Sequence, residues 1–358
     1  MTSRRDLGRR ALADLRDVAA SGPTAPQLFR QADLALRSVL GYDAVCWHAN
    51  DPATGLVTSV LTDDLDLNDF QHAVRLELWG DDVATFGKIR RSGARTETLS
   101  RATGGRLVDS VRYREQIKPA GFGDELRAAF DSKGGTWGCA AFMRAPDRGP
   151  YDAVERGLAE VASRYLGNAL RTCYQLDPAQ RLEPLPPAVL VLDHRNHLVD
   201  ADPGAQALLV EFADAASAVF SVPTPFATVA EHARVNAVSA TGLPAKSRVR
   251  ADDGRWFVLH ASLLDGRADG RVAIVATPAS PAEIMPVYLA AYSLTDREQL
   301  IALHAVRGRS TAEIAKSLSL TANTVQDHLK SVFAKTGVRS RRELVALVMT
   351  TNTPEIWF

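Results

Sequence analysis

The chain has few cysteines and no long apolar run. Its 358 residues include three cysteines, Cys46, Cys139 and Cys173, which stand far apart in the sequence. Such thiols form neither a disulfide framework nor a zinc knuckle, so we expect buried thiols, with a redox-sensing thiol as the alternative. No apolar run approaches the ~18 residues of a membrane span, and residues 1–10 lack the apolar core of a signal peptide. These absences predict a cytoplasmic protein without a membrane partner.

A net charge is absent too. The 42 Lys and Arg residues equal the 42 Asp and Glu residues in number, so the overall charge gives no sign of a nucleic-acid partner. The distribution is uneven, however. Residues 294–350 carry nine basic and five acidic side chains, so a basic C-terminal region follows a mildly acidic remainder.

Two proline-rich stretches divide the chain. Residues 177–187 contain four prolines and residues 277–286 contain three, and such clusters between periodic segments mark breaks. Because single cores stop growing near ~250 to 300 residues, the length also requires more than one domain. The composition, 46% hydrophobic and 23% charged, is that of folded domains. We predict three domains, at residues 1–176, 177–286 and 287–358.

The pattern of the first domain predicts helices around an antiparallel sheet. Helices are expected at 3–19, 26–40 and 151–171, and strands at 44–48, 56–61 and 135–144. The apolar residues of the last helix, among them Val154 and Leu158, are expected to face inward. The run at 137–142, followed by Tyr151, Asp152 and a long helix, resembles a GAF sensor domain. That resemblance leaves the ligand open, because no intact cyclic-nucleotide signature is present.

The second domain resembles a PAS domain. Its pattern predicts strands at 188–193, 197–202, 247–251, 255–263 and 271–276, with a short helix at 203–209. Asp252, Asp253 and Gly254 read as a hairpin turn. The whole chain is therefore predicted to be an α+β multidomain protein, with two antiparallel-sheet sensor domains followed by an all-α domain of four helices.

Three capping boxes punctuate the C-terminal region. The tetrapeptides that begin at Thr295, Ser310 and Ser340 each end in Glu, so a hydroxyl and a carboxylate can satisfy opposite free amides at a helix start. Thr321 can cap a further helix, which Gly337 would end. The result is four helices of about 10 to 15 residues, the second and third joined by a short turn as in a helix-turn-helix.

The third of these helices has an apolar and a polar face. The apolar face consists of Val325, Leu329, Val332 and Phe333. The polar face consists of Asn323, Gln326, Asp327 and Lys330. Amides and a cation on an amphipathic helix suit the DNA major groove, where Gln bonds adenine, Asp accepts from cytosine and Lys reaches guanine or phosphate. The alternative is that these side chains form a solvated surface.

The same region resembles the DNA-binding domain of LuxR-type regulators almost throughout. The matching residues are LTDRE at 294–298, GRS at 308–310, EIA at 313–315, TV at 324–325, KTGV at 335–338 and RSR at 339–341. The resemblance implies double-stranded DNA as a partner. Together with the helix pattern, it predicts DNA contacts from Ser310, Thr321, Asn323, Thr324, Gln326, Asp327, His328, Lys330, Lys335, Arg339 and Arg341.

Two positions depart from the family pattern. Many members carry Lys and a neutral residue where this chain has Gln326 and Asp327, which leaves the target sequence open. Asp327 would repel phosphate, so it either reads a base, caps a neighbour or lowers affinity. For His328, a packing role is the alternative to a contact with DNA.

The fourth helix carries an apolar stripe of Leu344, Leu347 and Val348. The resemblance implies that this stripe pairs two protomers, and a homodimer would bind a pseudo-palindromic site. Local core packing of the same residues is the alternative. RNA polymerase is a further candidate partner of such a regulator.

Enzymatic signatures are missing. The pair Asp63-Asp64 follows a hairpin strand and does not fit a receiver domain. Gly80 to Gly87-Lys88 has the wrong glycine spacing for a phosphate loop, and Ile89 replaces the hydroxyl that binds magnesium. We therefore expect no enzyme, no cofactor and no metal.

A small ligand remains the expected input, although its identity does not follow from the sequence. Aromatic and polar side chains around the first sheet suit a pocket, and the candidates are Cys46, His48, Trp79, Phe86 and Trp137. A purely structural core is the alternative for these residues. The sequence predicts a one-component transcription regulator, and the competing hypothesis is a signalling adaptor whose helical tail does not read DNA.

Overall fold

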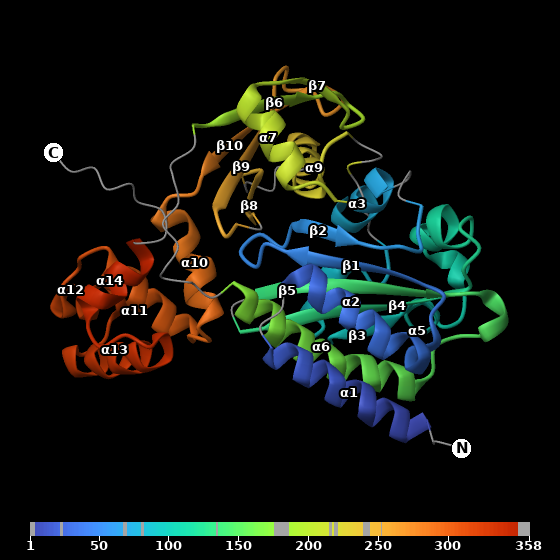
Figure 1. The fold of residues 1–358 in the computed structure, drawn as a ribbon, viewed down its shortest axis with the longest axis horizontal. Helices are drawn as coiled ribbons and strands as arrows, with labels where there is room; N and C mark the ends of the chain where they lie inside the picture. The colour runs from blue at the N-terminus through green and yellow to red at the C-terminus, as the bar shows by residue number, and fades with distance from the viewer. Residues whose placement is uncertain are drawn as a thin grey trace.

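Two antiparallel sheets and a group of C-terminal helices make up the computed structural model of the chain (Figure 1). The structure describes residues 4–21, 24–66, 70–79, 82–133, 135–174, 186–214, 217, 221–238, 244–251 and 253–349. Most of the first proline-rich stretch lies outside these residues. So does Asp252 of the expected hairpin turn. No helix in the described ranges is long and apolar enough to cross a membrane.

The first sheet has the strand order β2-β1-β5-β4-β3. Its strands are β1 (Ala44–Asn50), β2 (Val57–Leu61), β3 (Thr96–Thr98), β4 (Asp124–Ser132) and β5 (Gly135–Arg144). The helices around it are α1 (Arg4–Ala20), α2 (Ala25–Leu36), α3 (Phe70–Trp79), α4 (Phe86–Arg91), α5 (Leu99–Ala102) and α6 (Ala153–Cys173). The expected helices and strands of this region are confirmed, with boundaries shifted by a few residues.

The second sheet has the order β7-β6-β10-β9-β8. Its strands are β6 (Ala188–Leu192), β7 (Leu198–Ala201), β8 (Lys246–Arg250), β9 (Trp256–Leu263) and β10 (Val272–Pro278), with helices α7 (Pro203–Glu211) and α9 (Thr224–Val238). In both sheets the first strand lies beside the last, so the two sheets share one topology. Helix α9 packs between the second sheet and β2 and α3 of the first part.

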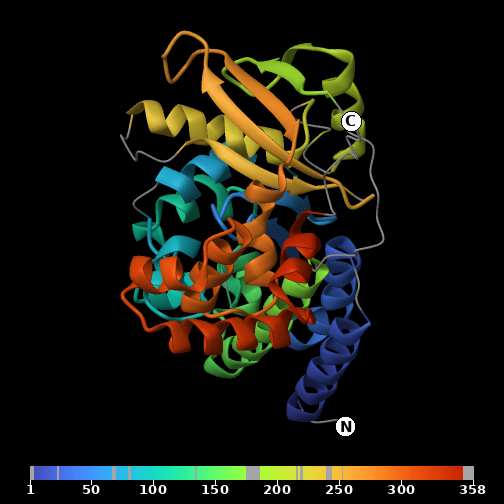
Figure 2. The ribbon, with the colours of Figure 1, turned by 90° about the vertical axis from the view of Figure 1, so that its left-hand side faces the viewer.

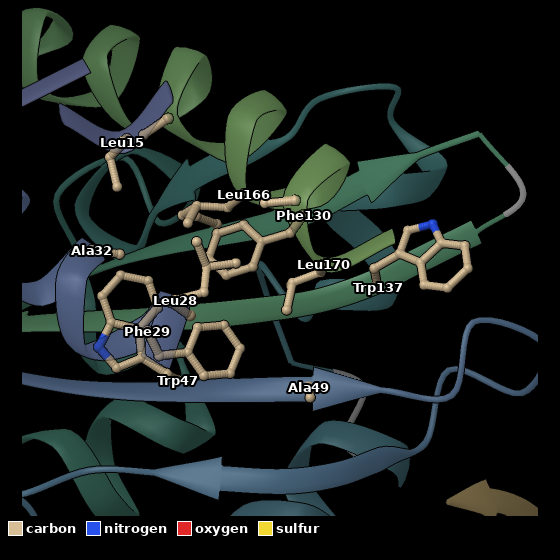
Figure 3. Close-up of a cluster of buried hydrophobic side chains, with 14 of the residues drawn as sticks. Leu15, Leu28, Phe29, Ala32, Trp47, Ala49, Phe130, Trp137, Leu166 and Leu170 are labelled. Atoms are coloured by element: carbon tan, nitrogen blue, oxygen red, sulfur yellow. The ribbon is translucent and has the colours of Figure 1, made fainter. Parts of the chain in front are cut away.

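One face of the first sheet is closed by α6 and α2. Figure 3 shows Trp47 and Phe130 on the sheet in one cluster with Leu166 and Leu170 of α6. A Cβ at Gly167 would lie 2.8 Å from the carbonyl oxygen of Asp131, so only glycine permits this close approach. The buried face of α6 is accordingly rich in small residues. The expectation that Val154 faces inward is wrong, because its side chain is 62% exposed.

The second proline-rich stretch spans the end of β10 and the start of a helix. β10 continues to Pro278, and helix α10 (Pro281–Ala291) begins at Pro281 and contains Pro286. Proline is favourable in a first helical turn, where its missing amide has no partner to lose. The domain boundary expected after residue 286 therefore falls inside a helix.

Helix α10 is buried on two sides. Ile284, Val287 and Tyr288 pack into the core of the first sheet and its helices. Met285 and Leu289 pack instead into the core of the C-terminal helices. Figure 1 shows α10 between these two parts of the molecule, and Figure 2 views them from the side of the C-terminal helices. One helix thus joins the sheets to the C-terminal region through two different apolar faces.

Four helices follow α10, namely α11 (Asp296–Val306), α12 (Thr311–Leu318), α13 (Ala322–Thr336) and α14 (Arg341–Met349). The capping boxes at Thr295 and Ser310 are confirmed. The third box forms only in part: Ser340 accepts from the Glu343 amide, but the Glu343 carboxylate accepts from the amide of Arg339. Gly337 ends α13 with a φ of 74°, in the left-handed region where glycine is favoured.

Candidate DNA-binding surface and ligand pocket

Helix α13 presents the two faces that its sequence predicts. Val325 and Leu329 are buried in a cluster with residues of α11 and α12. Val332 is buried in a cluster with residues of α10, α11 and α14. The exposed residues include Asn323, Gln326, Asp327 and Lys330. The α12–α13 turn passes through Ser319, which has a φ of 53°. A helix of 15 residues with one free polar face is the geometry that enters a major groove.

The exposed charges of α13 partly cancel. Lys330 Nζ lies 3.2 Å from Asp327 Oδ1, and both side chains are 74% exposed. Such a surface pair contributes little to stability, so both groups are free to exchange partners. Asp327 therefore offsets the charge of Lys330 in the free protein, and its role on DNA stays a prediction.

Several expected DNA contacts are engaged inside the domain. The hydroxyls of Ser310 and Thr321 accept hydrogen bonds from helix amides, and Thr324 Oγ1 lies 2.9 Å from that of Thr321. Arg341 Nη1 donates to the carbonyl oxygen of Arg309 at 2.6 Å. Arg339 is exposed and His328 is half-buried. Ser310 and Thr321 therefore cap helices in the free domain, and the DNA contacts expected from all these residues stay predictions.

Lys335 forms an ion pair between α13 and α11. Its Nζ lies 2.6 Å from Glu298 Oε2, and the Glu298 side chain is only 6% exposed. Burial alone would raise the pKa of Glu298, but hydrogen bonds from Lys335, Ser331 and the Thr295 amide lower it to about 2. The sequence did not reveal that Glu298 serves both a capping box and this ion pair.

The stripe on α14 is divided. Leu344 is fully buried in the cluster that includes Met285 and Val332, so it packs within its own chain. Leu347 is half-buried. The side chain of Val348 lies outside what the structure describes. For Leu344, local core packing is what the contacts show.

A cavity of about 500 Å³ opens on the other face of the first sheet. Its floor comes from strands β1, β4 and β5, its roof from α3 and α4, and one wall from the β1–β2 hairpin. The lining residues are His48, Asn50, Thr54, Gly55, Leu56, Val57, Ala73, Val74, Glu77, Thr85, Phe86, Gly87, Lys88, Arg90, Arg91, Arg127, Thr136, Cys139 and Thr228. Thr228 belongs to α9 and donates to the Val57 carbonyl oxygen at 2.8 Å, so the cavity borders the second part of the molecule.

His48 is held between two thiols. Its Nε2 lies 3.1 Å from Cys46 Sγ, and its Nδ1 lies 3.4 Å from Cys139 Sγ. Burial, reinforced by the charge of Arg127, lowers the pKa of His48 to about 3. Burial raises the pKa of Cys46 to about 12 and that of Cys139 well above its usual value. The imidazole is therefore neutral and the thiols stay protonated, which disfavours the redox-sensing alternative.

Arg127 is the buried cation of this cavity. Its guanidinium lies 3.7 Å from the centroid of the Phe86 ring, 2.7 Å from Glu77 Oε2 and 3.0 Å from the carbonyl oxygen of Ala84. Its Nε has no hydrogen-bond partner among the described residues. A charged side chain in the otherwise apolar run 126–130 was the sequence signal for this site, and sequence reasoning missed it.

The five expected ligand residues do not lie in one place. His48 and Phe86 line the cavity, whereas Cys46 is not part of the lining and contacts the His48 ring. Trp137 lies on the opposite face of the sheet, where its ring centroid is 5.3 Å from that of Tyr174. The side chain of Trp79, at the end of α3, is outside the described residues. Trp137 is thus a core residue, and the expectation that it lines this pocket is wrong.

A chain of polar contacts runs from the cavity hairpin to α10. Asp51, directly after the cavity residue Asn50, accepts from the backbone amide of Arg248 at 3.0 Å and from its Nη1 at 3.2 Å. Arg248 Nε donates to the carbonyl oxygen of Glu283 in α10 at 2.6 Å. Lys246 Nζ lies 2.8 Å from Glu283 Oε1. The hairpin that bounds the cavity is therefore tied to the helix that carries the C-terminal domain.

The fold of the C-terminal helices, with a free recognition helix after a short turn, defines a helix-turn-helix DNA-binding domain. Residues 292–348 match the family model described as bacterial regulatory proteins, luxR family. This part of the chain is a LuxR-family helix-turn-helix domain. No curated protein matches the chain.

The chain is similar to a number of solved structures, including the following three. A phage VqmA–DPO complex is 18% identical, with 46% of this chain and 80% of that chain covered and a TM-score of 0.23. A Vibrio cholerae VqmA–ligand–DNA complex is 20% identical, with 46% and 81% covered and a TM-score of 0.22. SdiA in complex with octanoyl-rac-glycerol is 13% identical, with 94% and 93% covered and a TM-score of 0.32. These scores are too low to establish a shared overall fold.

Proposed function

We propose that the protein is a sequence-specific, DNA-binding transcription regulator whose output is controlled by a small ligand in the first-sheet cavity. The observation that carries the DNA-binding part is the free polar face of α13 in a LuxR-family domain. Gln326 and Asp327 would read bases, and Lys330 would reach guanine or phosphate.

The regulator is proposed to act as a homodimer on a pseudo-palindromic site. Two-fold symmetry of the protein would match the symmetry of two half-sites. Leu344 is already buried within the chain, so the contact between protomers would use the more exposed rim of α14, with Leu347 as its apolar residue. Arg339 and Arg341 would then lie near the phosphates of each half-site.

Control would pass through α10. This helix packs on the sheet core with one face and on the DNA-binding helices with another, and Glu283 connects it to the cavity hairpin through Arg248 and Asp51. A ligand that binds one arrangement of the hairpin better than another would shift the position of α10. The protein therefore contains a continuous packed route between the proposed input and output.

Selection of bound genomic DNA tests the proposal against a signalling adaptor. We expect an enriched two-fold motif whose affinity falls with rising salt, as phosphate contacts require. Gln326→Ala should cost about 1 to 3 kcal/mol of discrimination at one position per half-site, whereas Asp17→Asn, in the distant α1, serves as the control. If no motif is enriched in any ligand state, the adaptor hypothesis replaces this proposal.

A further inference from the structure

We infer that the first-sheet cavity takes a small organic anion, with its charged group at the exposed edge between Arg90 and Arg91 and its apolar body against Phe86. The inference rests on the proposed function, in which this cavity is the input site. It adds the chemical class of the ligand, which follows from the residues that line the cavity.

The described lining is strongly cationic. It includes four basic side chains, Lys88, Arg90, Arg91 and Arg127, but one carboxylate, Glu77. Glu77 lies 2.7 Å from Arg127 and so is already neutralised. His48 adds no positive charge because it is neutral. Three of the four cations come from α4, so the basic side chains are concentrated on one side of the cavity.

Arg90 and Arg91 are the exposed cations of the described lining, so they face solvent at its edge. A Cβ on Gly55, in the β1–β2 turn, would lie 3.9 Å from Arg90 Nη1, and one on Gly87 would lie 3.3 Å from Arg91 Nη1. Arg90 therefore reaches across to the hairpin, whereas Arg91 folds back over its own helix. Arg90 also lies 3.5 Å from Asp131 Oδ1, at the outer edge of the site. A planar anion fits the paired donors that two guanidinium groups offer.

The interior of the cavity has a buried cation and an apolar wall. Arg127 lines the cavity, and its guanidinium lies 2.7 Å from Glu77 Oε2 and 3.6 Å from Glu125 Oε1. Val57, Val74 and Phe86 supply apolar contacts. A cavity of about 500 Å³ is large enough for a bicyclic ring.

Titration calorimetry of the full chain with 2-naphthoate and 2-naphthamide tests the charge of the ligand. The two probes share a ring system and differ in charge. Because a charged hydrogen bond contributes more than a neutral one, we expect 2-naphthoate to bind at least ~10-fold more tightly. In Arg90→Gln/Arg91→Gln this preference should fall below ~3-fold.

A matched variant controls for the loss of two charges. Arg106 and Arg164 are exposed residues of the same sheet region that do not line the cavity, so Arg106→Gln/Arg164→Gln should keep the ~10-fold preference. Equal binding of both probes, a preference lost equally in the control, or no binding of either probe would each overturn the inference. DNA selection with the same protein reports separately: an enriched motif without a charge preference leaves the DNA-binding function standing.

Discussion

The two sheets have corresponding strand orders, but different kinds of side chain lie between each sheet and its covering helices. On the first sheet, the face toward α3 and α4 carries His48, Asn50 and Arg127 and keeps a cavity open. On the second sheet, Phe257 and Leu259 belong to one buried apolar cluster with Phe226 of α9. Topology therefore does not decide whether polar or apolar side chains lie under the covering helices. The side chains on one face of the strands decide it, because polar groups that need partners prevent complete apolar packing.

The largest expected change in unfolding free energy comes from comparing a buried core residue of the second sheet with a residue that lines the cavity. Phe226 is fully buried, so Phe226→Ala should lower the free energy of unfolding by about 3 to 5 kcal/mol. Phe86 borders a cavity and is half-buried, so Phe86→Ala should cost less than about 2 kcal/mol. Urea unfolding followed by circular dichroism measures both. Equal costs would remove the distinction between the two sheets.

The next effect concerns the buried charge of the first sheet. Arg127→Met would leave Glu77 without its cation, and breaking a buried ion pair costs about 3 kcal/mol. Adding Glu77→Gln should recover at least about 1 kcal/mol, since the uncompensated carboxylate is then gone. A double-mutant cycle of unfolding free energies measures this recovery. Additive losses would show that the two groups are not coupled.

A smaller effect tests the link between the two sheets. Asp51 is fully buried and pairs with Arg248, so Asp51→Asn should destabilise the protein by about 2 kcal/mol. The variant should still bind the selected DNA but respond less to ligand, as fluorescence anisotropy with and without 2-naphthoate would measure. The exposed pair of Arg16 and Asp17 makes Asp17→Asn a control with an unchanged response. A full response in Asp51→Asn would contradict the proposed route.

The smallest effect is a pH dependence where the second sheet meets α10. Burial would raise the pKa of Glu283, but the hydrogen bond from Lys246 and the Ser280 cap lower it to about 2. A lowered pKa stabilises the fold above the unfolded value of about 4.3, and this contribution disappears as the pH falls toward 2. Because Glu283 is partly exposed, the contribution is about 1 kcal/mol. Glu283→Gln should show a weaker loss of stability than wild type between pH 5 and pH 3, as urea unfolding at the two pH values measures.

Local signals in the sequence were sufficient for α1, α2, α6, α7, the four C-terminal helices and most strands. They did not predict α3, α4, α5, α9, α10, β3 and β4 of the two sheet regions. Thr295 and Ser310 cap their helices with Glu three residues later, and the spacing of Val325, Leu329 and Val332 defines the buried face of α13. These interactions lie within a turn or two of the chain, so the sequence pattern contains them directly.

The pocket could be predicted only in part, because its lining comes from distant segments. His48 and Phe86 were expected and line the cavity, whereas Trp137 faces the other side of the sheet. Arg127 was missed, since its partner Glu77 is 50 residues away in sequence. Side-chain direction on a strand depends on register and bulges, and a bulge between Ala129 and its neighbours alters the pairing of β4 with β5 here.

The sequence by itself determined the DNA-binding domain, since caps, helical periodicity and family residues are all local. Only the tertiary structure decided that the later part of the second proline-rich stretch lies in helix α10, whose apolar residues are buried on two faces by different partners. Tertiary packing likewise decided that Leu344 is core and that a cavity lined by basic side chains lies against the first sheet. Burial is a property of elements brought together, and no segment specifies it alone.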